Sequence, residues 1–314
     1  MDGTLQVASV IYLTTRCRNL FLTLLFGHPL STHAQSLEPL WANTTYSLIS
    51  SYRAITSAHE AALPPNNGPG SGRRKPTAAH NELKKVLTRF RQVLSSEDTF
   101  YRDLISRLVG FYQLQPLARE YLSAVSIGCP NVIENGNGGV EHGLAPPMSA
   151  DERREKLGLV YKALICLGDL ERYKEQYDER ARREAREGRP AAQLQEKYGK
   201  AWTYYEVARA LVPDDGSAFN QLAVISTYVG DDFCCVYYYF RAMAVRIAFK
   251  NIGQILDKFL GKLYERWAAR IVRRRQGLPG QEGEEQDSEE MLDATGEMKR
   301  DLLVLAAILY RRQG

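Results

Sequence analysis

Residues 201–245 decide the fold, and they read AWTYYEVARALVPDDGSAFNQLAVISTYVGDDFCCVYYYFRAMAV. A shift of 34 residues superposes this stretch on itself. Small residues then fall on small residues and tyrosines on tyrosines: Ala201 on Cys235, Tyr204 on Tyr238, Tyr205 on Tyr239, Ala208 on Ala242 and Ala210 on Ala244. On a helix, a small residue, a ring four positions later and another small residue form one face, against which a neighbouring helix can pack closely.

A period of 34 residues is that of tetratricopeptide (TPR) repeats, whose unit is a hairpin of two helices. Each half of the stretch is therefore predicted to be the second helix of a hairpin. Pro213, with the Asp214-Asp215-Gly216 that follows, is predicted to end the first helix. The block Asn220-Gln221-Leu222-Ala223 is predicted to open the next helix, and Gly230-Asp231-Asp232 to form its turn.

The composition is that of an ordinary globular protein. Of the 314 residues, 44% are apolar and 25% are charged, and the net charge of +4 is too small to indicate nucleic-acid binding by itself. The five cysteines include no Cys-x-x-Cys pair, and the five histidines lack the spacing of a helical metal site. We expect no metal, no cofactor and no disulfide framework.

The repeat blocks resemble those of one family. The run Ala208…Leu211-x-Pro213-x-x-Gly216-x-x-x-Asn220-Gln221-Leu222-Ala223, followed by Tyr237-Tyr238-Tyr239-x-Arg241-Ala242-x-Ala244, is similar to a signature of the nonsense-mediated mRNA decay adaptors, the SMG proteins. The ever-shorter-telomeres proteins, which are telomerase subunits, belong to the same family. The resemblance extends over roughly residues 37–310 and is strongest over 164–245.

This resemblance implies an all-α fold, a 14-3-3-like helical array with TPR-type hairpins that forms an α-solenoid. We expect a 14-3-3-like TPR domain over residues 1–250 and the start of a C-terminal helical extension over 251–314, with an acidic disordered loop at about 277–292.

Apolar residues at steps of three and four predict further helices over residues 36–62, 80–113, 116–125, 150–188, 252–275 and 296–312. The second of these is predicted as two stretches, with Ser95 or Ser96 capping the latter, and Ser149 is predicted to cap the fourth. Residues 63–77 and 128–147 are predicted loops. In the last helix, Leu302, Leu305, Ala306 and Leu309 are predicted to face inward.

The apolar run within residues 7–26 is too short to span a bilayer, although its length suits a signal peptide. The cysteine pattern and the poor cleavage site favour a helix packed in the core. No membrane association is expected.

The predicted binding site is an anion pocket. In the family, the N-terminal helices resemble the phosphoserine-binding 14-3-3 fold, in which basic residues on facing helices clamp a phosphate and a tyrosine orients one of them. The block Leu167-Gly168-Asp169-Leu170-Glu171-Arg172-Tyr173 is similar to the family's Leu-Gly-Asp-x-x-Arg-Tyr, which implies phosphate binding by Arg172 and orientation by Tyr173.

A second group of residues completes this pocket. Tyr46 occupies a position where some members have a phosphate-binding lysine, and Arg53, two turns further along, matches a basic position of the 14-3-3 pattern. Tyr46 and Asn220 are candidate contacts to the peptide. From spacing alone, Arg172 could instead pair with Asp169 or Glu175 on its own helix, and Tyr237 to Tyr239 are expected in the core.

Two functions follow from these observations. The first is an adaptor in nonsense-mediated mRNA decay, in nucleus and cytoplasm, that binds the phosphorylated helicase of the pathway and other decay adaptors. The alternative is a telomerase accessory subunit that binds telomerase RNA or single-stranded DNA through a basic stripe on the helix over 252–275, formed by Lys262, Arg266, Arg270 and Arg273. A plain TPR scaffold with no phosphate preference is a third possibility. No nucleophile and base pair and no phosphate-binding loop stands out, so no enzymatic activity is expected.

Overall fold

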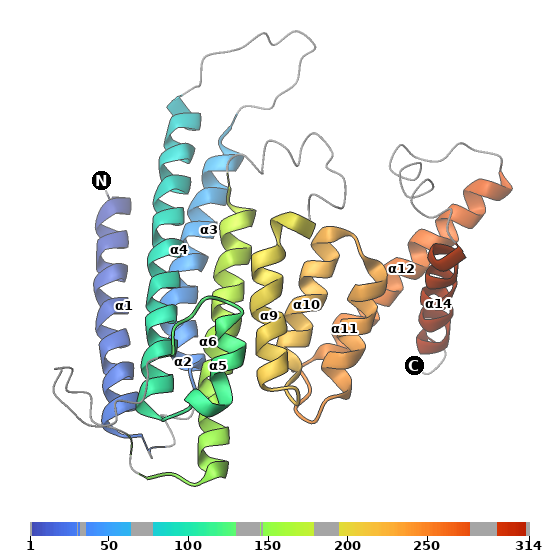
Figure 1. Ribbon diagram of the computed structural model, residues 1–314. Coiled ribbons are helices and arrows are strands. Elements are labelled where there is room, and N and C mark those ends of the chain that lie inside the picture. The colour runs from blue at the N-terminus through green and yellow to red at the C-terminus, as the bar shows by residue number, and fades with distance from the viewer. Residues whose placement is uncertain are drawn as a thin grey trace. The chain divides into compact units, whose positions relative to one another are not determined.

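The computed structural model describes residues 2–29, 31, 36–63, 78–129, 145, 147–178, 195–276 and 294–311. Every extended regular element within these ranges is a helix (Figure 1), which confirms the predicted all-α class. The helices are α1 (Asp2–Gly27), α2 (Glu38–Leu40), the π-helix η2 (Trp41–Thr45), α3 (Tyr46–Ala61), α4 (Ala78–Phe111), α5 (Gln115–Ser123), α6 (Ala150–Gln176), α9 (Gly199–Leu211), α10 (Gly216–Val229), α11 (Asp232–Ala244), α12 (Ile252–Arg275) and α14 (Ala294–Arg311). They divide into two compact units, Met1–Val212 and Pro213–Gly314.

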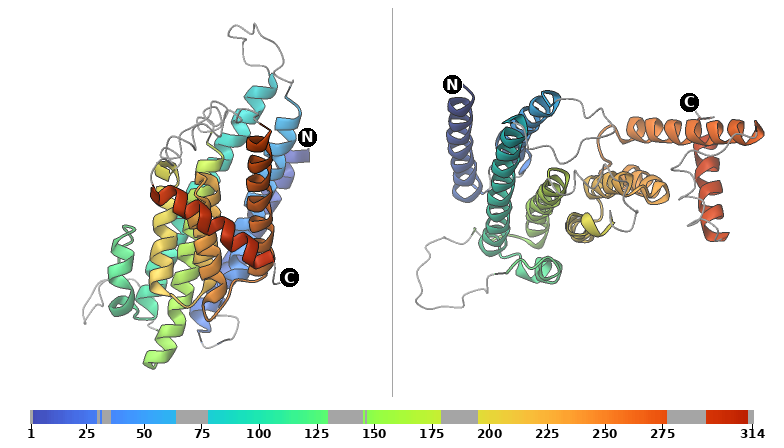
Figure 2. Two further views of the ribbon diagram at one scale, coloured as in Figure 1. Left: turned by 90° about the vertical axis from the view of Figure 1, so that its right-hand side faces the viewer. Right: turned by 90° about the horizontal axis from the view of Figure 1, so that it is seen from above.

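In the first unit, consecutive long helices pack on one another. The helix α3 packs on α4, α4 on α6 and α6 on α9, as Figures 1 and 2 show. Their shared faces are apolar and fully buried: Ile49, Phe90, Leu94, Ile105, Leu108, Leu164, Leu167 and Tyr205 are each 0% exposed. The N-terminal run forms α1, which packs on α2 and η2. Its predicted place in the core is wrong for most of the run: Leu25 is buried, but Tyr12, Leu13 and Leu20 are 63%, 57% and 60% exposed. No described helix is long and apolar enough to cross a membrane.

The predicted helix over 36–62 is realised as α2, η2 and α3 in one run. Its π-helical turn is stabilised by side chains on both sides: Thr44 Oγ1 donates to the Leu40 carbonyl at 2.5 Å, and Thr45 Oγ1 donates to the Glu97 carboxylate at 2.6 Å. Arg18 of α1 donates to the same carboxylate, with 2.6 Å between Arg18 Nη2 and Glu97 Oε2. Glu97 therefore ties α1 and η2 to α4 at one buried point.

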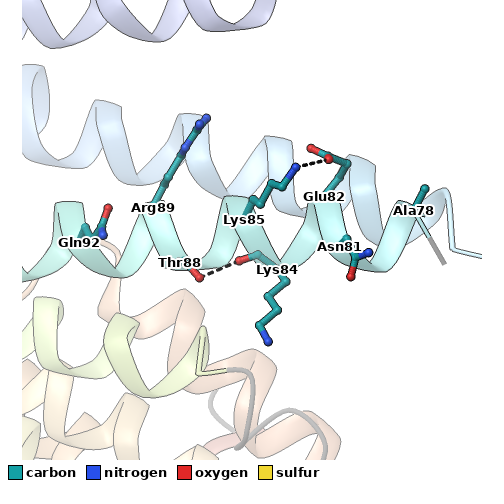
Figure 3. Close-up of a pocket in the computed structure, with 8 residues that line it drawn as sticks. All are labelled: Ala78, Asn81, Glu82, Lys84, Lys85, Thr88, Arg89 and Gln92. Atoms are coloured by element: carbon teal, nitrogen blue, oxygen red, sulfur yellow. Dashed lines mark hydrogen bonds and ion pairs between the residues drawn. The ribbon is translucent and has the colours of Figure 1, made fainter. Parts of the chain in front are cut away.

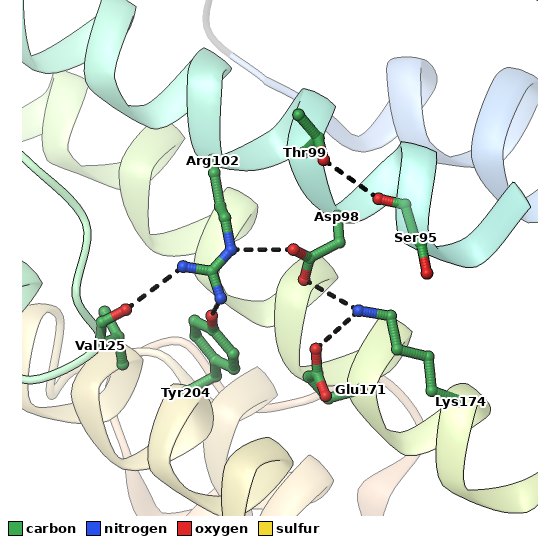
Figure 4. A network of polar contacts seen from close by, with 8 residues as sticks. All are labelled: Ser95, Asp98, Thr99, Arg102, Val125, Glu171, Lys174 and Tyr204. Carbon is green, nitrogen blue, oxygen red and sulfur yellow. Dashed lines mark hydrogen bonds and ion pairs between the residues drawn. The ribbon is translucent and has the colours of Figure 1, made fainter. Parts of the chain in front are cut away.

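A second set of polar contacts joins α4, α6 and α9 (Figure 4). Arg102 donates to Asp98 at 2.8 Å and to the hydroxyl of Tyr204 on α9. Lys174 of α6 pairs with Glu171 at 2.7 Å and with Asp98 at 3.3 Å. This cross-link fixes the three helices relative to one another inside the first unit.

The predicted break at Ser95 or Ser96 is wrong, because α4 runs without interruption from Ala78 to Phe111. Leu94 is fully buried and Glu97 is 4% exposed, so tertiary contacts hold the helix through the serines. The predicted cap at Ser149 is confirmed: its hydroxyl accepts from the Glu152 N–H at 3.2 Å, and the Glu152 side chain accepts from the Ser149 N–H at 2.7 Å. The described part of this helix ends at Gln176, and residues 179–188 of the prediction lie outside the described residues.

In the second unit, α10 and α11 form the predicted hairpin, and Gly230 closes its turn with the left-handed φ of 83° that favours glycine. The helix α10 begins at Gly216 and not at Asn220, which lies in its second turn. A side chain at Gly216 would lie 2.7 Å from the Phe249 nitrogen, so only glycine fits there. The core of this unit joins Phe219, Cys235, Tyr239, Leu256, Leu260 and Ala307.

The inward face predicted for the last helix is wrong. Leu302 and Leu305 are 48% and 51% exposed, Ala306 is half-buried, and Ala307 is fully buried, so the inward face is offset from the predicted one. The side chain of Leu309, most of the predicted loops over 63–77 and 128–147, and the acidic loop predicted at about 277–292 lie outside the described residues.

Candidate functional site

The two arginines predicted to hold a phosphate are far apart in the sequence, but both lie close to one aromatic ring. Arg53 comes from α3, and Arg172 and Tyr173 come from α6. The guanidinium carbon of Arg172 is 4.6 Å from the centre of the Tyr173 ring, and that of Arg53 is 5.8 Å from the same ring. The structure therefore brings the three predicted residues together, within the first unit.

Arg172 is 8% exposed and is held by an acid and a hydroxyl. Its Nη2 donates to Asp169 Oδ1 at 2.8 Å, as the alternative interpretation of its spacing allowed. Its Nε lies 3.5 Å from the hydroxyl of Tyr205 on α9, and that hydroxyl donates to the same Asp169 oxygen at 2.7 Å. Asp169, Arg172 and Tyr205 thus form a closed and buried triangle.

This triangle keeps Arg172 charged. Burial lowers the pKa of the guanidinium, but the charge of Asp169 and its hydrogen bond outweigh burial, so the pKa is raised above its ordinary value. Burial, together with the nearby Asp169 charge, raises the pKa of Tyr205 well above its ordinary value, so the hydroxyl stays protonated and can donate. Arg172 therefore remains a cation, and its charge is already paired with that of Asp169.

The triangle depends on a glycine. A side-chain carbon at Gly168 would lie 2.7 Å from Cδ1 of Tyr205 and closer still to Cε1 and would overlap the ring. Glycine at this position lets α9 approach α6 so closely that the Tyr205 hydroxyl reaches Asp169. The Gly-Asp pair of the sequence block thus has a packing role and an electrostatic role.

Arg53 is the accessible member of the pair. It is exposed, and no carboxylate pairs with it among the described residues. Its Nε donates to the Tyr177 hydroxyl at 3.3 Å. Burial lowers the pKa of Arg53, but the Tyr177 hydrogen bond and neighbouring hydroxyls raise it, with a net increase.

An aromatic row supports Tyr177 from behind. Its ring packs at 4.9 Å on Phe90 of α4, which is itself stacked on Tyr52 of α3 at 5.1 Å, with 3° between the ring planes. The exposed Arg53 therefore donates to a hydroxyl whose ring is packed on two further aromatic side chains.

The remaining predicted contacts fall in different places. Tyr46 is 41% exposed and lies two turns before Arg53 on α3, so both belong to the exposed face of that helix. Asn220 belongs to the second unit, where it is 6% exposed.

The predicted basic stripe also lies in the second unit, on α12. Lys262 and Arg266 are exposed, and Arg270 and Arg273 are half-buried. Arg266 pairs with Asp232 of α11 at 2.9 Å, which neutralises part of the stripe.

The other surface features of the described residues give weaker indications of a binding site. A hollow along the first turns of α4 is lined by Ala78, Asn81, Glu82, Lys84, Lys85, Thr88, Arg89 and Gln92 (Figure 3). Because these residues all come from one helix, they do not enclose a ligand, and none belongs to the predicted site. Within the described ranges, no three metal-ligating side chains come together.

Sequence reasoning missed Tyr205 and Tyr177. Both contact the arginines from outside the motif that carries Arg172: Tyr205 from a different helix and Tyr177 from just beyond the end of α6. The only sequence signal for Tyr205 was its place in the 34-residue repeat, which predicted a core residue.

Comparison with known families covers most of the chain. A model described as telomerase activating protein Est1 matches residues 35–178, and one described as the Est1 DNA/RNA binding domain matches residues 201–293. The first match contains Arg53, Arg172 and Tyr173, and the second contains α12.

Individual relatives show the same pattern. A nonsense-mediated mRNA decay factor SMG7-like protein of Arabidopsis thaliana is 30% identical over 56% of this chain and 15% of its own length. The decay factor SMG7 of the same plant is 27% identical over 72% of this chain and 19% of its own, and telomerase-binding protein EST1A of Danio rerio is 23% identical over 66% and 10%. The chain thus spans less than a fifth of the length of these relatives.

The fold has a counterpart among solved structures. A crystal structure of Est1 and Cdc13 contains a chain that superposes with a TM-score of 0.56 and 14% identity, over 98% of this chain and 56% of that one. At this identity the likeness concerns the fold.

Proposed function

The chain belongs to the SMG/EST1 family, and from this premise we propose that it binds peptides phosphorylated on serine or threonine and acts as an adaptor in nonsense-mediated mRNA decay. The observation that carries the proposal is the approach of Arg53 and Arg172 to the one ring of Tyr173. The proposed partners are the phosphorylated helicase of the pathway and other decay adaptors, in nucleus and cytoplasm. No enzymatic step is part of this role.

The two arginines would share the phosphate unequally. Arg53 can offer its terminal nitrogens as a fork, which matches two phosphate oxygens. Arg172 already uses Nε and one N–H of Nη2 for Tyr205 and Asp169, so its remaining donors are the N–H groups of Nη1 and the second N–H of Nη2. Because Arg172 is nearly buried and already paired with Asp169, it would supply fewer contacts, while the exposed Arg53 makes the larger share.

The energies limit what the two arginines can achieve alone. A hydrogen bond to a charged group contributes about 1.5 to 3 kcal/mol, whereas micromolar affinity requires about 8 kcal/mol. Peptide residues beside the phosphate must supply the difference. The exposed ring of Tyr46, on the same face of α3 as Arg53, is the proposed surface for them.

Fluorescence polarisation with two peptide pools tests the proposal. One pool has random sequence around a fixed phosphoserine, and the other has serine in its place. We expect the chain to prefer the phosphoserine pool by at least about tenfold, which corresponds to about 1.4 kcal/mol. Equal affinity for the two pools would leave only a scaffold without phosphate preference.

Charge reversal localises the binding. Arg53→Glu should remove the preference and leave the fold intact, because Arg53 is exposed and pairs with no acid in the described part of the chain. The matched control is Arg154→Glu, the same change at an exposed site near the start of α6, which should bind as the wild type does. A phosphoserine preference that survives in Arg53→Glu would contradict the proposed site.

The family model for DNA/RNA binding favours a second candidate function, a telomerase accessory subunit that binds RNA or single-stranded DNA through α12. If Lys262, Arg270 and Arg273 each contact a phosphate, the logarithm of affinity should fall with the logarithm of salt at a slope of about −2. Reversing these three charges should abolish a gel shift with single-stranded RNA. Reversing Lys84, Lys85 and Arg89 on α4 is the matched control. Absence of a shift at low salt would remove this candidate.

A further inference from the structure

We infer that Tyr205 is a positioning residue of the phosphate site, which holds Arg172 through Asp169 from a separate helix. This inference rests on the proposed function. It adds to the site a residue of α9, which lies outside the sequence block over residues 167–173. Its basis is the buried triangle of Asp169, Arg172 and Tyr205 and the glycine that permits it.

Two of the three contacts in the triangle converge on one atom. Asp169 Oδ1 accepts from Arg172 Nη2 at 2.8 Å and from the Tyr205 hydroxyl at 2.7 Å. An acid and an arginine three residues apart on one helix can pair in several rotamers, each of which points the guanidinium differently. The Tyr205 hydroxyl fixes the acceptor atom and closes one edge of the guanidinium, so that a single orientation remains.

Removal of the Tyr205 hydroxyl should change the orientation of the Arg172 guanidinium but not its charge. Without it, Asp169 would still neutralise the buried guanidinium, but both groups would be free to turn within the space left behind. A phosphate that binds through the remaining N–H groups of Arg172 depends on where those groups point. Arg53 is held separately by Tyr177 and should be unaffected.

The neighbouring tyrosine provides a control with the same chemistry. Tyr204 precedes Tyr205 on α9 and is likewise buried, but its hydroxyl contacts Arg102 in the cross-link to α4 (Figure 4). Tyr204→Phe and Tyr205→Phe each delete one buried hydroxyl from the same turn of the same helix. Only the second deletion touches the pair that carries Arg172.

The experiment measures both variants against the phosphoserine and serine pools, with thermal unfolding as the check on folding. Tyr205→Phe should weaken binding to the phosphoserine pool by about threefold to tenfold, the range given by one net hydrogen bond, and leave binding to the serine pool unchanged. Tyr204→Phe should lower the unfolding temperature without changing the preference. In an Arg172→Lys background, Tyr205→Phe should have no additional effect, since the group it positions is gone.

A measurement on the wild-type chain needs no variant to fold. Nitrogen-15 NMR with inorganic phosphate should shift the terminal N–H signals of Arg53 and Arg172, while the Arg172 Nε–H beside Tyr205 stays protected from exchange. Loss of that protection would mean that Arg172 leaves Tyr205 in order to bind, and would overturn the inference.

Failure of the inference and failure of the proposed function have different signatures. If the wild-type chain itself does not distinguish the two pools, the proposed function fails. If the wild type distinguishes them and Tyr205→Phe does so equally well, or weakens both pools alike, Tyr205 is a core residue and only the inference fails.

Discussion

Gly168 makes the most exacting steric demand in the candidate site. Gly168→Ala would place a carbon within 2.7 Å of the Tyr205 ring, so α6 and α9 would have to separate, at an expected loss of about 1 to 3 kcal/mol of stability. Gly158→Ala on the same helix is the control, because a side-chain carbon there meets nothing within 4 Å, and it should stabilise the helix by about 0.5 to 1 kcal/mol. Urea unfolding of the two variants checks the difference, and equal effects would contradict the close packing.

Arg172 and Arg53 should differ in what they contribute to stability. Arg172→Leu would leave Asp169, which is 8% exposed, without its counter-charge, at a cost of about 3 to 5 kcal/mol. Arg53→Leu removes an exposed side chain that has no acidic partner within the described ranges, and it should change stability by less than about 0.5 kcal/mol. Chemical denaturation measures both, and similar values for the two variants would contradict the assignment of Arg172 to a buried ion pair.

At the scale of single helices, the capping box of Ser149 and Glu152 at the start of α6 should make a contribution to stability that depends on pH. The backbone hydrogen bond from Ser149 lowers the pKa of Glu152 below 4.5. A lowered folded pKa means that the contribution of Glu152 is fully present above its unfolded pKa and is lost as pH falls through the folded value. Glu152→Ala should therefore be less stable than the wild type at pH 7, and the difference should shrink as the pH falls below 4.5.

The same cap can be tested from its other side. Ser149→Ala should cost about 1 kcal/mol at neutral pH, since it removes the acceptor for the Glu152 N–H. Thermal unfolding across the pH range checks both variants. If the unfolding temperatures of Glu152→Ala and the wild type differ by the same amount at every pH, the predicted pH dependence of the cap is contradicted.

Helix positions could be predicted from the sequence where periodicity and capping agree, as at Ser149 and over Ile252–Arg275. They could not be predicted where tertiary packing overrides local preference. The serines within α4 favour a break, yet buried neighbours on both sides keep the helix whole. The predicted inward face of α14 contains Leu302, Leu305 and Ala306, although the helix contributes Ala307 to the core that it shares with α12.

The same limit applies to the site. A motif places Arg172 and Asp169 one turn apart on a helix, so their pairing could be predicted from spacing. The reach of Tyr205 to that pair depends on the distance between two helices, which no local pattern encodes. Gly168 belongs to the same sequence block as Arg172, but its packing role depends on the Tyr205 ring, which comes from another helix.

At the scale of the whole molecule, the two compact units have separate apolar cores, and the candidate phosphate site lies entirely in the first. Leu256→Ala, in the fully buried core of the second unit, should destabilise that unit by about 2 to 5 kcal/mol. In this variant, phosphopeptide binding should persist under conditions in which the second unit has begun to unfold. Hydrogen exchange and polarisation measured together check this, and parallel loss of protection and binding would contradict the confinement of the site to the first unit.

The wide turn at Trp41–Thr45 makes one amino acid in this segment dispensable. A π-helical turn holds one residue more than an α-turn, so excision of the exposed Asn43 would convert it to regular α-helix and leave the flanking helices in phase. Excision of Ser50, inside α3, would instead rotate Arg53 by about 100° away from Tyr173. This chain should therefore tolerate the loss of one residue in the wide turn, whereas the loss of one residue inside α3 should disrupt the approach of Arg53 to Tyr173.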